Sequence, residues 1–334
     1  MIARRAAHLA AALCLALSVR GQPAPGASGF NSFTVRPAFH ERTASFTLEP
    51  EVKVEINAPA APAPARKTVL IFYALPNGNT IGQTIGRKLQ PGDDWHFDIQ
   101  HIGAQTRFLR QALPDRNIVV VYLQANQRSW PAWRKKHGDA PIPGLLDSIR
   151  KIVAAPDPEI VLGGHSGGGS FIFGCLNAAT NIPDNIVRLA FLDSDYAYDP
   201  ALGHTEKFQR WLEASPQHRL CVIAYNDDTA LANGKPFVSA SGGTWGRSHL
   251  MLADLGARFK FTRQTAGDLE TDTALGGQIK FLLMANPEHK ILHTVQVERN
   301  GFIEAMLSGT TNEAAGYQYF GPRAYEKWIK KGQN

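Results

Sequence analysis

Ser166 stands in a glycine-rich turn that has the residue types needed for nucleophilic catalysis. The segment Gly164-His165-Ser166-Gly167-Gly168 follows an apolar stretch at 159–163 and precedes another at 171–176. A Gly-x-Ser-x-Gly turn between a strand and a helix strains the serine backbone so that its hydroxyl projects above the sheet, and the flanking glycines avoid collisions. N–H groups at the start of the helix point toward the same place, where an oxyanion would form. The pattern predicts that Ser166 attacks an acyl carbon.

Two other glycine-rich loops fit the segment less well. A phosphate-binding loop needs Gly-Lys-Ser/Thr, which does not follow here. The glycines also lack the Gly-x-Gly-x-x-Gly spacing of a dinucleotide-binding turn. A glycine-rich turn without any catalytic role remains the alternative.

The elements that would position Ser166 alternate between apolar strands and amphipathic helices. This alternation predicts an α/β fold, with a mostly parallel central sheet and helices on both faces. We expect strands at 68–73, 118–123, 160–163, 187–192, 220–225 and 291–297, with a further short one possible at 259–262. We expect helices at about 99–112, 143–154, 168–180, 205–214, 245–256 and 274–285.

The segments before this alternation predict export and a small added β element. Residues 1–21 combine an arginine pair, an apolar run and small residues, as in a secretory signal peptide. Residues 22–42, rich in Pro, Gly, Ser and Ala, predict a flexible leader. The stretches 45–48 and 52–56 alternate apolar and polar residues and predict an N-terminal β-hairpin. The remaining chain, 43–334, is expected to be one domain.

The serine turn in its strand–turn–helix setting resembles that of the α/β-hydrolase superfamily. By strand order the resemblance extends over about 45–330, but at the level of motifs only the turn matches. It implies an oxyanion hole built from the N–H of Gly167 and one N–H from the loop after the strand at 68–73. Because Pro76 has no N–H, Asn77 or Gly78 would donate, unless this Asn-Gly segment is an ordinary turn.

The resemblance also implies an acidic residue after a later strand. Asp227, with Asp228 beside it, follows the expected strand at 220–225 and preserves the chain order of serine, acid and histidine. Asp193 and Asp195 follow the strand at 187–192 and are the other candidates. We favour Asp227. Those aspartates that are not used would cap helices or turns.

The histidine base is harder to find. No histidine follows the expected last strand at 291–297, and Glu304 stands where one would be expected. His293 would lie near the start of that strand, toward the wrong end of the sheet, which favours a structural role. His249 could fold over the site or be an exposed residue in the first turn of a helix. His165 is expected to orient the turn, because consecutive residues there point apart.

Composition and charge narrow the classes of function. The 334 residues are 44% hydrophobic, which excludes a disordered or fibrous chain. Loss of Arg4, Arg5 and Arg20 with the signal peptide lowers the formal charge from +6 to +3, too little to indicate nucleic-acid binding. The scattered histidines suggest neither a metal site nor a cofactor, and Cys175 and Cys221 are expected to be buried thiols.

Two interpretations follow. The first is a secreted or periplasmic serine hydrolase that cleaves an ester or related acyl bond of a small molecule through an acyl-enzyme at Ser166, with no stable membrane span after signal cleavage. The second is a catalytically degraded protein of the same fold that binds a small ligand or a partner protein. The apparent lack of a base supports the second, since a serine hydroxyl without one is a weak nucleophile.

Overall fold

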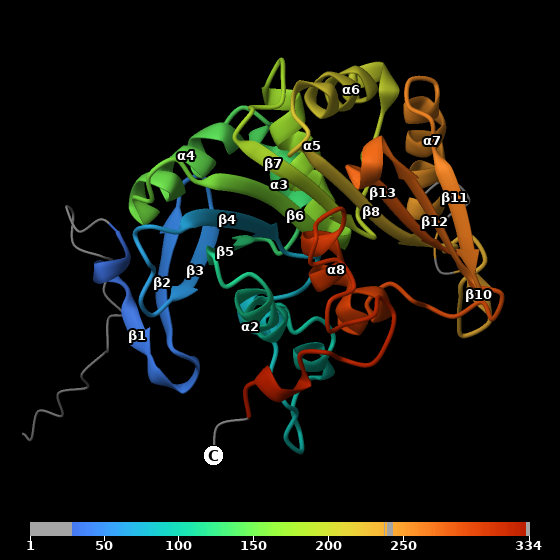
Figure 1. Ribbon diagram of the computed structural model, residues 1–334. Coiled ribbons are helices and arrows are strands. Elements are labelled where there is room, and N and C mark those ends of the chain that lie inside the picture. Colours follow the sequence, from blue (N-terminus) through green and yellow to red (C-terminus); the bar gives the residue numbers. More distant parts are fainter. Residues whose placement is uncertain (1–28, 237, 239–242, 332–334) are drawn as a thin grey trace, which may run out of the picture.

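An 11-stranded sheet forms the centre of the molecule, with the strand order β1-β2-β3-β5-β4-β6-β7-β8-β13-β12-β11 (Figure 1). The computed structural model describes residues 29–236, 238 and 243–331. The expected signal peptide therefore lies outside the described residues. The strands of the sheet are β1 (Thr34–Arg36), β2 (Glu41–Leu48), β3 (Val52–Pro59), β4 (Lys67–Ala74), β5 (Arg116–Ala125), β6 (Glu159–His165), β7 (Ile186–Leu192), β8 (Arg219–Tyr225), β11 (Thr262–Ala266), β12 (Leu269–Ala274) and β13 (Ile279–Met284).

The sheet is mixed, which corrects the expectation of a mostly parallel one. Strands β5, β4, β6, β7, β8 and β13 run parallel to their neighbours in this block. The outer strands β1, β2 and β3 on one side, and β12 and β11 on the other, pair antiparallel. Parallel pairing requires crossovers, which supply the helices, whereas the outer strands are joined by short turns. The two short strands β9 (Leu231–Ala232) and β10 (Lys235–Pro236) form a separate pair.

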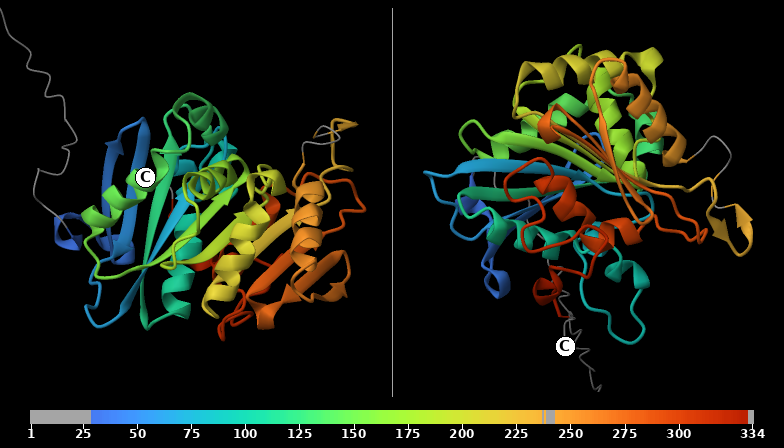
Figure 2. Two further views of the ribbon diagram at one scale, coloured as in Figure 1. Left: turned by 90° about the horizontal axis from the view of Figure 1, so that it is seen from above. Right: turned by 45° about the vertical axis from the view of Figure 1, so that its right-hand side comes forward.

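Helices cover both faces of the sheet (Figure 2). One face packs against α3 (Trp130–His137), α4 (Ile142–Val153), α5 (Gly169–Ala178), α6 (His204–Ala214) and α7 (Thr244–Gly256). The other packs against α1 (Ile81–Ile85), α2 (Ile102–Ala112), α8 (Phe302–Leu307) and the C-terminal segment. Because the central strands are buried on both faces, their sequences are almost continuously apolar. Within the described ranges, none of the helices combines the length and the apolar character that a membrane crossing needs.

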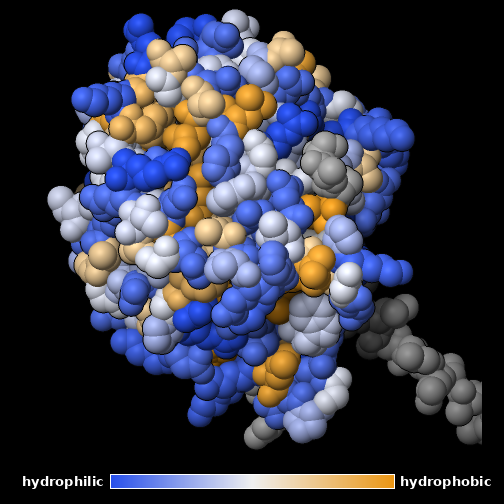
Figure 3. Space-filling view, turned by 90° about the vertical axis from the view of Figure 1, so that its right-hand side faces the viewer, coloured by the Kyte–Doolittle hydropathy of each residue, from blue (hydrophilic) through white to orange (hydrophobic). Residues whose placement is uncertain are grey.

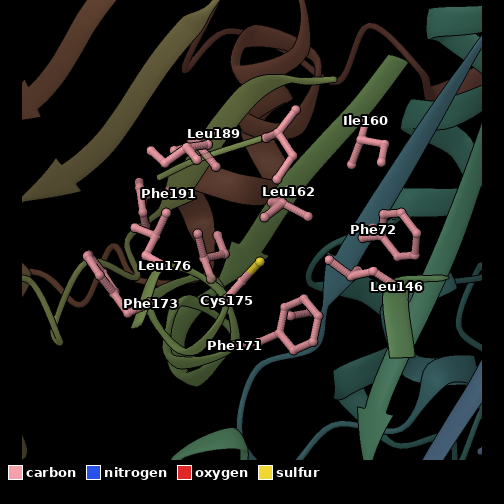
Figure 4. Packing of buried hydrophobic residues seen from close by; sticks show 14 of the residues in the cluster. Phe72, Leu146, Ile160, Leu162, Phe171, Phe173, Cys175, Leu176, Leu189 and Phe191 are labelled. Atoms are coloured by element: carbon pink, nitrogen blue, oxygen red, sulfur yellow. The ribbon is translucent and has the colours of Figure 1, made fainter. Parts of the chain in front are cut away.

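Helix α5, which follows the serine turn, is the most deeply packed helix near the site. Cys175 and Phe173 point from it toward strands β6 and β7, where Leu162 and Phe191 meet them, and Phe171 lies on the side of Phe72 (Figure 4). Cys175 and Cys221 are both buried and unpaired, as expected. This packing fixes the start of α5, and with it the turn, to the middle of the sheet.

The end of the chain differs most from the sequence-based expectation. The predicted helix at 274–285 is wrong, because residues 279–284 form β13, beside β8. The predicted strand at 291–297 is wrong as well, because this segment is a turn that leads into the helical stretch before α8. A short apolar run such as that of β13 has no periodicity that distinguishes a strand from a buried helix. The possible strand at 259–262 is displaced, since β11 begins at Thr262.

At the N-terminus, β2 and β3 pair antiparallel with Leu48 opposite Val52. The expected leader, 22–42, lies partly outside the described residues. Within the described part, β1 pairs with β2, and β2 begins at Glu41. This part of the expected flexible leader therefore adds strands to the sheet.

Candidate active site

Ser166 occupies a strained turn between β6 and α5. Its backbone φ is +54°, in the left-handed region that residues other than glycine seldom adopt. The turn fits tightly, since a Cβ atom on Gly164 would lie 2.8 Å from the carbonyl carbon of Gly168. A Cβ atom on Gly168 would lie 2.1 Å from the carbonyl oxygen of Ala74, on β4. Only glycine fits at these two positions, and the turn leaves Ser166 partly exposed at the carboxyl end of β6.

His165 ties this turn to a distant segment of the chain. Its ring is buried, and its Nε2 donates a hydrogen bond of 3.0 Å to the carbonyl oxygen of His293. The two imidazole rings lie with their centres 4.5 Å apart. Burial, with the neighbouring His293, holds the pKa of His165 well below its usual range, so this ring is neutral. The expected orienting role of His165 thus has a specific partner, and His293 lies beside the serine turn.

His293 pairs with a buried carboxylate. Its Nδ1 contacts Oδ2 of Asp193, and its side chain is 15% exposed. Because a carboxylate only accepts hydrogen bonds, Nδ1 carries the proton in this contact. The expectation that His293 lies at the wrong end of the sheet is wrong, because it rested on a strand at 291–297. His293 instead lies in the connection that leaves the carboxyl end of β13.

Asp193 follows β7 and is fully buried. Its backbone φ is +48°, and its N–H donates to the carbonyl oxygen of Ile223 on β8 at 2.7 Å. One carboxylate oxygen contacts His293, and the other accepts a hydrogen bond from the hydroxyl of Thr244. Asp193 is therefore held from both sides in the position that a histidine-orienting acid requires.

Asp227, the favoured acid, makes different contacts. Its oxygens accept the backbone N–H of Thr244 at 2.8 Å and that of Trp245 at 3.2 Å, at the start of α7. Burial and the neighbouring Asp193 raise the pKa of Asp227. The described contacts make Asp227 a helix cap, because the first N–H groups of a helix lack partners within it. Its neighbour Asp228 is exposed.

Asp195 is buried nearby, and among the described residues it forms no hydrogen bond to a histidine. One of its oxygens accepts a hydrogen bond of 2.8 Å from the hydroxyl of Ser248, on α7. The other oxygen has no hydrogen-bond partner among the described residues. Burial raises the pKa of Asp195 to about 8.

The other two candidate bases are engaged elsewhere. His249 lies on α7, where its Nδ1 hydrogen-bonds the carbonyl oxygen of Trp245, 2.9 Å away in its own helix. Glu304 lies on α8 and forms a buried ion pair with Lys280, with 2.6 Å between Oε1 and Nζ. Its other oxygen accepts the hydroxyl of Tyr317 at 2.8 Å. The expectation that Glu304 occupies the place of a base is therefore wrong.

The two loop residues expected to donate to the oxyanion differ in whether their backbone N–H already has an acceptor. The N–H of Gly78 donates to the carbonyl oxygen of Arg128 at 2.8 Å, so it is already used. In the part of the chain that the structure describes, the N–H of Asn77 has no acceptor. The Asn77 side chain lies against the turn, since a Cβ atom on Gly167 would lie 2.1 Å from its Oδ1. Asn77 and Gly167 are thus neighbours at the carboxyl ends of β4 and β6.

Sequence reasoning missed Thr244, which contacts Asp193 and Asp227 at once. The only signal was its place at the start of an expected helix, directly after a segment rich in Ser and Gly. Neither the contact with Asp193 nor the choice among the aspartates can be read from local sequence, because α7 brings these residues together only in the folded chain.

Solved structures resemble this chain in fold. A protein named FAE aligns with a TM-score of 0.50 at 12% identity, over 89% of this chain and 95% of that one. A mutant feruloyl esterase module from Clostridium thermocellum, complexed with sinapinate, aligns with a TM-score of 0.45 at 11% identity, over 75% and 83% of the two chains. LpqC, a poly(3-hydroxybutyrate) depolymerase from Bordetella parapertussis, gives 0.43 at 15% identity, over 80% and 89%.

Comparisons of sequence give no such relatives: no known protein family and no curated protein matches the chain. The strand order, the strained serine after a central parallel strand and the likeness to FAE agree with one another. The chain has the fold of the α/β-hydrolase superfamily.

Proposed function

We propose that this protein is a serine hydrolase that cleaves an ester or a related acyl bond through an acyl-enzyme at Ser166. The observation that carries the proposal is the pairing of His293 with the buried Asp193, directly beside the strained turn of Ser166. In this proposal Asp193, rather than Asp227, is the acid of the triad.

The proposed reaction uses each side chain in one step. His293 Nε2 takes the proton of the Ser166 hydroxyl while Oγ bonds to the acyl carbon, and the carbonyl oxygen becomes an oxyanion. The same proton then passes to the leaving alcohol as the bond between the acyl carbon and the alcohol oxygen breaks. Water reverses these steps and releases the carboxylic acid. Asp193 holds the tautomer of His293 and stabilises its positive charge.

The N–H groups of Gly167 and Asn77 are the proposed donors to the oxyanion. The engaged N–H of Gly78 makes it the weaker choice of the two loop residues. Loss of one such donor typically costs about 10²–10³-fold in turnover in other enzymes.

A catalytically degraded protein that binds a small ligand or a partner remains the competing function. Its main support was the lack of a histidine beyond the last strand. The pairing of His293 with Asp193 weakens that support, because a histidine that is bonded to a buried carboxylate lies beside the serine turn.

Labelling with a fluorophosphonate tests the proposal directly. We expect the folded full chain to form an adduct at Ser166, mapped by mass spectrometry, because only an activated hydroxyl attacks the phosphorus. Heat-denatured protein and the variant Ser166→Ala are the controls and should not react. A folded chain that is not labelled and hydrolyses no activated ester would favour the binding protein.

We also propose that the chain is exported to the periplasm or secreted. The charged start, apolar run and small residues of 1–21 support this. The mass of the protein recovered from the exported fraction should be lower by about the first 21 residues. An intact N-terminus in that fraction would contradict cleavage.

A further inference from the structure

A cavity lies at the opposite end of the sheet from Ser166. It has a volume of about 370 Å³, within the range of small-molecule sites. Val69, Val161 and Val187, near the amino ends of β4, β6 and β7, form part of its wall, and Leu109 and Met306 close it from α2 and α8. Ser166 follows the carboxyl end of β6, whereas the cavity lies at its amino end. The length of β6 therefore separates Ser166 from the cavity by roughly 20 Å.

Two arginines line this cavity side by side. Arg188 on β7 and Arg219 on β8 are direct partners in the parallel register of these strands. Arg188 is only 5% exposed, and Arg219 is partly buried. Neither forms a salt bridge with a carboxylate within the described ranges.

The hydrogen bonds of both arginines go to neutral oxygens. Arg188 donates to the carbonyl oxygens of Ala305 and Ser308 and to the hydroxyl of Ser308, each at 2.9 Å. Arg219 donates to the carbonyl oxygens of Gly309 at 3.0 Å and Gln217 at 2.8 Å. A guanidinium carries five N–H groups, so each arginine keeps N–H groups without an acceptor among the described residues.

Other basic residues at this end of the sheet are neutralised. Lys280, on the neighbouring β13, has both Glu304 and Glu313 as partners. Arg116 lines the same cavity and pairs with Asp115 at 3.3 Å and Glu159 at 3.2 Å. Asp115 and Glu159, the two carboxylates in the cavity wall, are therefore both ion-pair partners of Arg116. In the described part of the chain no carboxylate forms an ion pair with Arg188 or Arg219. Glu304, which pairs with Lys280, acts on Arg188 only over a longer distance, so the two neighbouring cations are costly to bury.

We propose that this cavity binds an amphiphilic carboxylate, that is, a carboxylate head group on a short apolar chain. The head group would accept the remaining N–H groups of Arg188 and Arg219, since a guanidinium fork matches a carboxylate in shape and charge. The chain would lie against the aliphatic walls formed by the strands, α2 and α8. This site does not depend on the catalytic function proposed above.

The test uses octanoate as the probe, titrated calorimetrically into the full chain. We expect saturable binding to one site, at least tenfold tighter than binding of neutral octanol or of short-chain propionate. Arg219→Gln should weaken octanoate binding at least tenfold. Arg219→Lys, which keeps the charge, should weaken it less. Arg116→Lys, which keeps the charge that Asp115 and Glu159 face, is the matched control in the same cavity and should change octanoate binding less than twofold.

Each contrary result has a definite meaning. No saturable binding of octanoate, or equal binding of octanol, would overturn the proposal. Binding that Arg219→Gln leaves unchanged would place octanoate elsewhere, for example beside Ser166, and would also overturn it. Equal losses in Arg219→Gln and Arg116→Lys would show a general disturbance of the cavity rather than recognition of the carboxylate by Arg219, and would overturn the proposal. Circular dichroism of each variant shows that it is folded.

Discussion

Around Ser166, each side chain is held in place by the next. His165 bonds to the backbone of His293, His293 bonds to Asp193, and Asp193 is held by Thr244. These bonds distinguish Asp193 from Asp227, the aspartate that the sequence favours. Asp193 contacts the imidazole of His293, whereas Asp227 accepts backbone N–H groups at the start of α7.

Replacing the two aspartates one at a time tests this difference. Asp193→Asn should lower kcat for an activated ester by on the order of 10³–10⁴-fold, because an amide does not fix the tautomer and charge of His293 as a carboxylate does. Asp227→Asn keeps an oxygen that can accept one helix N–H and should keep most of the activity while lowering the melting temperature. Steady-state kinetics and thermal melts measure both effects. The reverse order of kcat values would return the triad acid to Asp227.

Glu304 stands in the sequence where a histidine base was expected, but in the structure its side chain is bonded to groups outside the candidate active site. Its carboxylate is taken up by Lys280 and Tyr317 under α8. A histidine introduced there would therefore meet these groups rather than Ser166. It would also leave Lys280 with one carboxylate fewer, so the substitution would disturb the fold without supplying a base.

Among the elements, those with a clear pattern were predictable from sequence. The strands that became β4, β5, β6, β7 and β8, and the helices that became α2, α4, α5, α6 and α7, lie within a few residues of their expected places. The serine turn was equally clear. The last strand was not, because the apolar run of β13 has the length of a strand but no alternation. Because the last strand was expected at 291–297 instead, His293 was expected at the wrong end of the sheet.

Helix α7 supplies the contact that local sequence could not predict. Its first residue, Thr244, donates its backbone N–H to Asp227 and its hydroxyl to Asp193. The helix cap and the proposed triad acid are therefore linked through one residue.

Replacing this threonine tests the link. Thr244→Val removes the hydroxyl but keeps the backbone N–H and the shape of the side chain. It should lower kcat by about tenfold, the effect of losing one charge-assisted hydrogen bond of roughly 1.5 kcal/mol, with KM little changed. Thr244→Ser should restore most of the rate. A loss of stability without any change in kcat in the valine variant would make the bond purely structural.

At the scale of the whole molecule, the two ends of the sheet have different chemistry. Three buried aspartates gather at the carboxyl ends of β7 and β8, whereas the amino ends carry the neighbouring arginines Arg188 and Arg219. The acidic end has a consequence for folding, because burial raises the pKa of Asp195 to about 8.

The stability of the folded chain should therefore depend on the charge of Asp195. The unfolded chain loses this proton near pH 4, while the folded chain keeps it until about pH 8. The contribution of Asp195 is fully present below about pH 4 and is lost as the pH rises through about 8. Asp195→Asn should reduce the fall in unfolding free energy between about pH 5 and about pH 8.5 by on the order of a few kcal/mol.

Urea denaturation at several pH values measures this effect. Asp228→Asn, at an exposed position in the same region, is the control and should follow the wild type. Equal pH profiles for Asp195→Asn and the wild type would mean that Asp195 stays ionised in the folded chain.

The two edges of the sheet also affect how copies of the protein meet. An open sheet offers unpaired N–H and carbonyl groups along its outer strands, and these can recruit strands from other molecules. Here one edge strand, β1, has three residues and is followed by Pro37, while β11 is exposed along its length and carries Arg263, paired with Asp272. The surface on the side of β11 and α7 is mostly hydrophilic, crossed by a short strip of apolar residues (Figure 3). Short, polar and charged edges disfavour edge-to-edge aggregation, so an 11-stranded sheet that is open at both ends resists growing into a fibre.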